Sequence, residues 1–361
     1  MTNGLDDVIA AETILSEVDG TNGRLIIRGF ELGQLAGRKS FEDVIALLWD
    51  GFFPAPSQDL ASELGAARVR VFQEVSALDT GLLDRSPVEA MRALMGRIPD
   101  GDDLQTALTL TAAPAVFTAA VVRAQSGLAP VAPDASLGHA ADILRMLRKG
   151  PASPSEIAAL DTYLTTVCDH GLNASTFAAR VVASTQAGLT SAALAGLSAL
   201  KGPLHGGAPG PIIDMLDGIA QSQDAKAWIL EALNRGDRLM GFGHRVYQVR
   251  DPRADALKSA VQRLAAEPNG RPSRVAFAET VEQAVLDILK AHKPGRSLQT
   301  NVEFYTALLL EALAFPPTAF TCVFAMGRVA GWIAHAREQA TGGRLIRPAS
   351  RYVGAWPKAA A

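Results

Sequence analysis

The chain has 361 residues, of which 48% are hydrophobic and 20% charged, the proportions of an ordinary globular protein. Its formal net charge of −3 argues against general nucleic-acid binding. Two cysteines, Cys168 and Cys322, lie far apart in no metal-binding spacing, so we expect a reduced cytoplasmic protein without a metal site. The length suffices for one large core, more naturally divided into two lobes.

Taken in chain order, the predicted elements are almost all helices. The clearest strand signal, residues 24–29, follows a turn-like segment and predicts a small N-terminal β-hairpin. A helix start follows at Ser40, and two capping boxes with proline at the first helical position follow at Ser86–Glu89 and Ser153–Glu156. Alternating strand and helix signals are absent, so the sequence predicts an all-α fold.

Two segments bear on targeting and membranes. The N-terminal residues include Asp6 and Asp7 and no basic segment followed by an apolar one, so we expect no signal peptide. Residues 181–200 carry no charge and are long enough to cross a bilayer, but they are rich in Ala, Gly, Ser and Thr. Because small side chains let helices approach closely, we interpret this segment as one buried helix at a protein–protein interface, and expect no membrane partner.

Three of the six histidines lie beside glycines in loop-like settings, namely His170, His205 and His244. Such settings leave an imidazole accessible to a ligand. Arginine is concentrated in residues 238–258 and 323–351, which are locally basic in an acidic chain. The alternative is a pair of solvated basic surfaces, but neutral imidazoles beside guanidinium groups suit a site that binds small polycarboxylates and polarises their carbonyls.

At these motifs the chain resembles the citrate synthase family in its short prokaryotic form. The resemblance runs in order through most of the sequence, over residues 16–29, 47–51, 169–180, 201–208, 240–247, 251–254, 301–305, 331–335 and 347–354. It implies a two-domain, multi-helical homodimer with a small N-terminal β-hairpin. The large domain would comprise residues 1–207 plus 319–361, and the small domain residues 208–318.

The resemblance also implies a reaction, the condensation of acetyl-CoA with oxaloacetate to citrate and CoA through an enolate and citryl-CoA. It assigns Glu303 as the base, His205 as hydrogen-bond donor to the thioester oxygen and His244 as donor to the ketone of oxaloacetate. A thioester methyl group is a very weak acid, so a carboxylate can take its proton only if the forming enolate is stabilised. No tightly bound cofactor is implied, since acetyl-CoA and CoA are substrate and product.

Further residues are assigned to binding by the same resemblance. His170, Arg253 and Arg328 would hold oxaloacetate, whose carboxylates suit guanidinium groups. Arg347 matches a position that reaches into the partner subunit's site, which makes the homodimer a condition of activity. Binding of CoA is assigned to a glycine-containing loop and two arginines: Leu239, Gly241, Gly243, Arg245 and Arg250. Other histidines carry no such assignment, and we assign His335 to helix packing.

The chain departs from the family pattern in three places. Glu303 stands where the family usually has Asp, and displacing a catalytic group by about 1 Å can cost on the order of a hundredfold in rate. Because Glu is chemically the same base, we interpret it as competent. Gln248 replaces a usual basic residue, so Arg250 would substitute or CoA would bind differently. Gly171 replaces a common glutamate after His170, which could loosen that histidine's orientation.

Two alternatives to citrate synthesis stay open from the sequence. One is a 2-methylcitrate synthase that uses propionyl-CoA, because one methyl group changes discrimination by only about 1–3 kcal/mol in an apolar pocket. The other is a non-catalytic, ligand-binding dimer that kept the fold and lost turnover. This alternative arises because Glu303 stands where the family usually has Asp.

Overall fold

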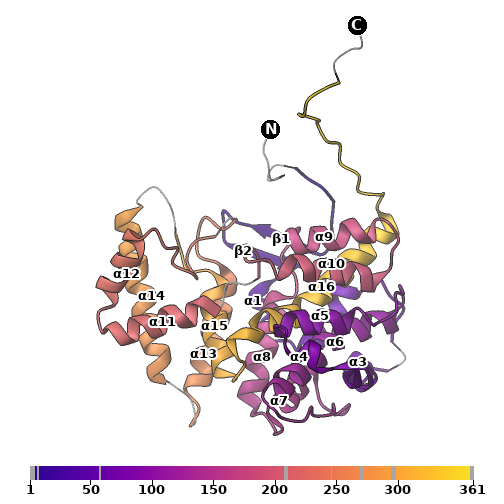
Figure 1. Ribbon diagram of the computed structural model, residues 1–361, viewed down its shortest axis with the longest axis horizontal. Helices are drawn as coiled ribbons and strands as arrows, with labels where there is room; N and C mark the ends of the chain where they lie inside the picture. Colours follow the sequence, from indigo (N-terminus) through magenta and orange to yellow (C-terminus); the bar gives the residue numbers. More distant parts are fainter. Residues whose placement is uncertain are drawn as a thin grey trace.

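The computed structural model describes residues 5, 8–56, 58–206, 210–244, 246–268, 272–293 and 298–357. Over these residues the protein is a multi-helical assembly with one small antiparallel sheet near the N-terminus (Figure 1). The predicted all-α fold is therefore confirmed.

The sheet has three strands, β1 (Ser16–Asp19), β2 (Arg24–Ile27) and β3 (Phe30–Glu31), in the order β1-β2-β3. Leu25 and Ile27 of β2 are buried while Arg24 is exposed, the alternation that a half-buried strand requires. The predicted hairpin is thus confirmed, with one strand more than expected.

We refer to the helices up to residue 206, together with η2 and the last helix, as the larger lobe. Its shorter helices are α1 (Leu32–Leu35), α2 (Phe41–Trp49), α3 (Leu60–Phe72), η1 (Gln73–Ala77), α4 (Thr80–Leu83), α5 (Pro87–Met95), α7 (His139–Arg148), α8 (Pro154–Val167), α9 (Ala174–Ala183), α10 (Leu189–Leu200) and η2 (Pro317–Ala319). Its two long helices, α6 (Leu104–Gln125) and α16 (Phe320–Gly342), pack against each other.

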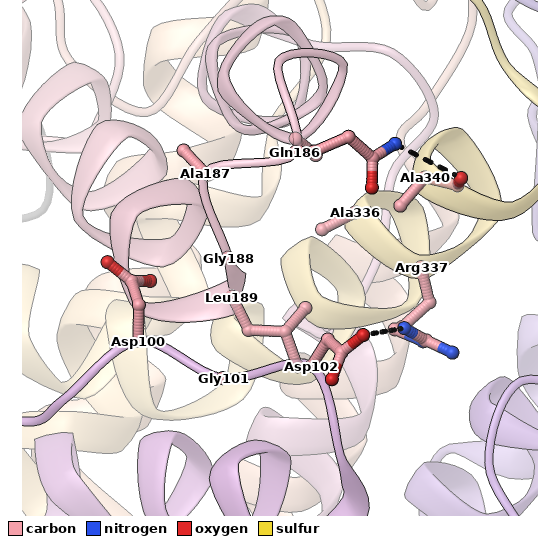
Figure 2. A pocket seen from close by; sticks show the side chains of 11 residues that line it. Asp100, Gly101, Asp102, Gln186, Ala187, Gly188, Leu189, Ala336, Arg337 and Ala340 are labelled. Atoms are coloured by element: carbon pink, nitrogen blue, oxygen red, sulfur yellow. Dashed lines mark hydrogen bonds and ion pairs between the residues drawn. The ribbon is translucent and has the colours of Figure 1, made fainter.

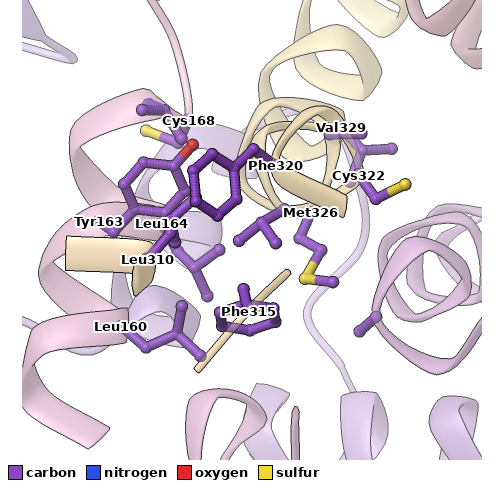
Figure 3. Close-up of a cluster of buried hydrophobic side chains, with 14 of the residues drawn as sticks. Leu160, Tyr163, Leu164, Cys168, Leu310, Phe315, Phe320, Cys322, Met326 and Val329 are labelled. Atoms are coloured by element: carbon purple, nitrogen blue, oxygen red, sulfur yellow. The ribbon is translucent and has the colours of Figure 1, made fainter. Parts of the chain in front are cut away.

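By length and composition α6 and α16 could each cross a membrane, but 83% and 89% of their most apolar windows are buried inside the protein. Figure 3 shows what α16 covers: Phe320 and Met326 lie in one cluster with Tyr163 of α8 and with Leu310. Apolar surface removed from water in this way contributes about 25 cal/mol per Å². Both are core helices of a globular protein.

Local capping signals place several helix starts. The side-chain oxygens of Ser40 and Ser153 accept hydrogen bonds from backbone N–H groups in the first turns of α2 and α8, and both capping boxes are complete. The predicted capping box at Ser86 is wrong. Helix α5 does begin there with Pro87, but the Ser86 hydroxyl donates to the Glu89 carboxylate, 2.9 Å away, and caps no backbone N–H.

The single helix expected over residues 181–200 is also wrong, since α9 ends at Ala183 and α10 begins at Leu189. Gly188 has a φ of 99° in the connecting turn, a conformation that side chains strongly disfavour. Asp100 accepts from the backbone N–H of Ser191 at 2.9 Å and so caps the start of α10.

We refer to the helices between residue 206 and η2 as the smaller lobe, namely α11 (Gly210–Ser222), α12 (Ala225–Asn234), α13 (Pro252–Ala265), α14 (Pro272–His292) and α15 (Val302–Ala312). Figure 1 shows α11, α12 and α14 gathered at one end of the molecule. Helix α13 packs against both α15 and α8, and so joins the smaller lobe to the larger one. The domain limits at residues 208 and 318 stay predictions.

Beyond α16 the chain continues without helix or strand over residues 343–357. In Figure 1 this segment leaves the body of the molecule on the side where the N-terminal segment also emerges. Tyr352, Val353 and Trp356 are exposed along it, at 62%, 87% and 76%.

Candidate active site

Three of the predicted site residues meet, although they come from separate motifs. His170 follows α8, and its ring centroid lies 5.8 Å from that of His244, in the connection between α12 and α13. Nη2 of Arg253, in the first turn of α13, lies 3.1 Å from Nε2 of His244. The imidazoles and the guanidinium therefore form one cluster.

The loop that carries His244 is held against the segment that leads to Glu303. Gly241 and Gly243 have φ angles of 87° and 84°, which explains why glycine is needed at both positions. The N–H of Gly243 donates to the carbonyl of Gln299 at 2.7 Å, and the N–H of Asn301 to that of Gly241 at 2.9 Å. This pairing fixes the start of α15 beside the histidine loop.

Hydrogen bonds determine which ring nitrogen of His244 carries the proton. Nδ1 accepts from the backbone N–H groups of Val246 and Tyr247, at 2.9 and 3.0 Å. Burial, followed by the charge of Arg253, lowers the pKa of His244 to about 4, so the ring is neutral at pH 7. Nε2 therefore bears the hydrogen, and it faces another donor, the Arg253 guanidinium. Two converging donors make a site for a ligand oxygen.

Asp251 joins Arg253 to helix α15. Its carboxylate accepts from Nε and Nη2 of Arg253 at 3.0 and 2.9 Å, and from the N–H of Val302 at 3.2 Å. Asp251 is fully buried, so its charge balances that of Arg253 in a medium of low dielectric. Asp251 was not among the residues predicted for the site. Its place as N-cap of α13 was the signal available.

Glu303 lies in the first turn of α15, where Asn301 caps the helix by accepting from its N–H at 3.0 Å. Burial raises the pKa of Glu303 to about 7, although the charges of Arg253 and Arg238 act in the opposite direction. A carboxyl group that titrates near neutral pH is a stronger base than an ordinary one. With neighbouring histidines held neutral, the site contains groups with distinct acid–base roles.

His205 is positioned by Ser175, a residue that sequence reasoning missed. Its Nε2 lies 2.8 Å from Oγ of Ser175, which also accepts from Nε1 of Trp332 at 3.2 Å. Burial and then the charge of Arg328 lower the pKa of His205 to about 4, so this ring is neutral as well. With Nε2 engaged by Ser175, Nδ1 is the ring nitrogen that can serve a ligand.

Arg328 connects His205 to the other histidines. It is fully buried, its Nε donates to the carbonyl of Val167 at 2.6 Å, and burial lowers its pKa to about 10. Its charge helps to lower the pKa of both His205 and His170. A buried cation of this kind gains from an anionic ligand, because desolvation has left it incompletely compensated.

Next to His170 in the sequence, Asp169 belongs to a buried chain of hydrogen bonds that includes His335. Nδ1 of His335 accepts from Nη1 of Arg180 at 2.9 Å, so its Nε2–H donates to the carboxylate of Asp169 at 3.2 Å. The assignment of His335 to packing alone is therefore incomplete. These hydrogen bonds fix the side chain of Asp169, the residue that directly precedes His170 in the chain.

Of the remaining predicted residues, Leu239, Arg250 and Arg347 are described by the structure, and none of them contacts the three residues of this cluster. Arg250 contacts the carboxylates of Asp255 and Glu282, at 2.5 and 3.1 Å, and would have to exchange these partners for a phosphate. Leu239 is buried, and Arg347 is exposed on the C-terminal segment. Arg245 lies outside the described residues. These assignments stay predictions.

A cavity of about 270 Å³ lies elsewhere, at the turn between α9 and α10 (Figure 2). Asp100, Asp102 and Arg337 line it, and none of the predicted site residues does. Among the described residues, no group of three or more His, Cys, Asp or Glu side chains is placed to hold a metal ion. The histidine cluster is therefore the candidate active site.

Comparison with known proteins bears on this site. The family description "Citrate synthase, C-terminal domain" matches residues 4–349. The chain is 38% identical to "Putative citrate synthase 2" of Mycobacterium tuberculosis, over 98% of this chain and 93% of that protein. It is 36% identical to a citrate synthase of Haloferax volcanii, over 98% and 96%. A 2-methylcitrate synthase of Mycobacterium tuberculosis is 34% identical, over 97% and 90%.

The solved structures similar to this chain are also citrate synthases. Citrate synthase from Thermotoga maritima superimposes with a TM-score of 0.83 at 30% identity, over 98% of this chain and 96% of that one. The ternary complex of carboxymethyl coenzyme A and oxaloacetate with citrate synthase from Thermoplasma acidophilum superimposes with a TM-score of 0.85 at 27% identity, over 100% of this chain and 98% of that one.

Proposed function

Because the chain belongs to the citrate synthase family, we propose that it condenses acetyl-CoA with oxaloacetate to give citrate and free CoA. It is an acyltransferase of the kind that converts an acyl group into an alkyl group on transfer. The methyl carbon of the thioester attacks the ketone carbon of oxaloacetate, and water then hydrolyses the thioester of citryl-CoA. Both steps require stabilisation of charge that develops on oxygen.

One observation carries the proposal: Nε2–H of His244 and the guanidinium of Arg253 are two donors whose heavy atoms lie 3.1 Å apart. Two donors so close repel unless one acceptor takes a hydrogen bond from both. The ketone and carboxylate oxygens of oxaloacetate supply such acceptors. A hydrogen bond from His244 to the ketone makes its carbon electrophilic, and Arg253 pairs with the adjacent carboxylate.

Glu303 is the base of this proposal. Its raised pKa, about 7, supports removal of a proton from the acetyl methyl group at neutral pH. The Ser175 hydroxyl, which donates to Oδ1 of Asn173 in this structure, turns to donate to Nε2 of His205, and the neutral ring then donates from Nδ1 to the thioester oxygen as the enolate forms. His170 and Arg328 hold the rest of oxaloacetate, and the buried Arg328 meets a carboxylate.

The wider assignments belong to the same proposal. CoA lies along the loop of Leu239, Gly241 and Gly243, with Arg245 and Arg250 at its phosphates. The cleft is formed between a large domain of residues 1–207 plus 319–361 and a small domain of residues 208–318. The functional unit is a cytoplasmic homodimer in which Arg347 enters the partner's site, which the exposed C-terminal segment supports.

A thiol-release assay with a panel of short acyl-CoAs and 2-oxo acids tests the proposal. We expect acetyl-CoA and oxaloacetate to give the highest kcat/KM. A preference for propionyl-CoA would identify a 2-methylcitrate synthase, the name carried by one of the relatives. Oxaloacetate binding without release of thiol from any acyl-CoA would instead identify a ligand-binding dimer and reject catalysis.

A further inference from the structure

Tyr247 touches three of the site residues, yet no role has been assigned to it so far. Its hydroxyl lies 3.1 Å from Nε2 of His170. Its ring centroid lies 4.8 Å from that of His244, and Cζ of Arg253 lies 5.7 Å from the same ring. Tyr247 is only 3% exposed, so these contacts define its surroundings.

The bond between Tyr247 and His170 crosses from one lobe to the other. His170 follows α8 of the larger lobe, whereas Tyr247 lies in the connection that leads into α13. An imidazole in such a bond cannot rotate freely about its χ2 angle. The hydroxyl therefore restricts the orientation of His170 from a separate segment of the chain.

Both ends of this bond are anchored to the N-terminal sheet. The N–H of Gln248 donates to the carbonyl of Gly20 at 2.9 Å, and the N–H of Gly171 donates to Oγ of Ser16, also at 2.9 Å. A side chain at Gly20 would lie 2.2 Å from the carbonyl oxygen of Val246, so only glycine permits this approach. The sheet thus sets the separation between Tyr247 and His170.

We propose that Tyr247 is a positioning residue whose hydroxyl orients His170 across the two lobes and so prepares the oxaloacetate side of the site. This inference rests on the proposed function. Orienting a binding group before the ligand arrives reduces the ordering that the ligand must bring about. The face of the Tyr247 ring also constrains Arg253 through a cation–π contact.

The test is Tyr247→Phe, which removes the hydroxyl and keeps the ring. One net hydrogen bond corresponds to about a two- to tenfold change, so we expect KM and Kd for oxaloacetate to rise by that factor. At saturating oxaloacetate kcat should change less than about twofold, because the hydroxyl does not touch the reacting atoms. The ¹⁵N ring resonances of His170 should shift in the unliganded variant. Tyr247→Leu, which also removes the ring, should raise both KM and Kd for oxaloacetate further than Tyr247→Phe does.

Thr111→Val is the control, since it removes a buried hydroxyl whose hydrogen bond, 2.9 Å to the carbonyl of Ala107, lies within α6. It should leave KM for oxaloacetate and the His170 resonances unchanged. Unchanged KM and resonances in Tyr247→Phe would overturn the inference, as would a loss of thermal stability with no selective effect on oxaloacetate. If the parent protein releases no thiol, the proposed function fails, while the resonances of His170 still decide the role of Tyr247.

Discussion

The assignment of Glu303 as the base gives the sharpest prediction, because its environment sets a pH dependence. Burial raises its pKa to about 7, whereas the pKa values of His205 and His244 are lowered to about 4. Only the deprotonated carboxylate can accept a proton from the acetyl methyl group. Above pH 5.5 or so the histidines stay neutral, and the protonation of Glu303 alone controls the rate.

The magnitude follows from that pKa. A group with a pKa of about 7 is roughly one-tenth deprotonated at pH 6 and nine-tenths deprotonated at pH 8. We therefore expect kcat/KM for acetyl-CoA to rise about tenfold between these values and then to level off. An unshifted glutamate would give a flat profile over the same range.

Two substitutions sharpen this test in the thiol-release assay. Glu303→Gln keeps the size and removes the base, and should lower kcat by roughly 10²- to 10⁴-fold. Glu303→Asp restores the residue usual in the family but withdraws the carboxylate by about one C–C bond, 1.5 Å, in a site shaped for glutamate. We expect about a hundredfold loss. A flat pH profile of the parent, or a fully active Glu303→Gln variant, would refute the reasoning.

Two more predictions concern the dimer and stability. If Arg347 acts in the partner's site, homodimers of Arg347→Ala and of Glu303→Gln are each nearly inactive. When the two variants exchange subunits, half of the dimers carry one intact site, so about a quarter of the parent activity should return. No recovery would place Arg347 in its own subunit's site. Burial, and then Glu42, raise the pKa of Asp161 to about 7. Because the pKa of this carboxyl group is higher in the folded than in the unfolded protein, the free energy of unfolding falls as the pH rises between the two values, from about 4 to 7. Asp161→Asn should therefore raise the free energy of unfolding at pH 8 by about 1–2 kcal/mol, after allowance for partial exposure, and by less at pH 5; equal effects in urea denaturation at both values would contradict this.

Much of the fold could be predicted because its signals are local. The caps at Ser40 and Ser153 need only residues within one turn, and both form as expected. At Ser86 the same pattern fails because the hydroxyl bonds to Glu89 instead. The break at Gly188 was not predicted, since Asp100, which caps the following helix, is distant in the sequence.

By itself the sequence determined the helical architecture and supplied the histidines, arginines and carboxylate from which a site is proposed, because glycine-flanked motifs can be read within a few residues. Tertiary structure alone decided how they are held. Ser175 contacts His205 although 30 positions separate them in the sequence, and Tyr247 contacts His170 although 77 positions separate those two. The protonation states also arise only on folding, since burial beside Arg253 and Arg328 is what keeps the imidazoles neutral. Desolvation and charge proximity are properties of the assembled lobes, and no stretch of sequence contains them.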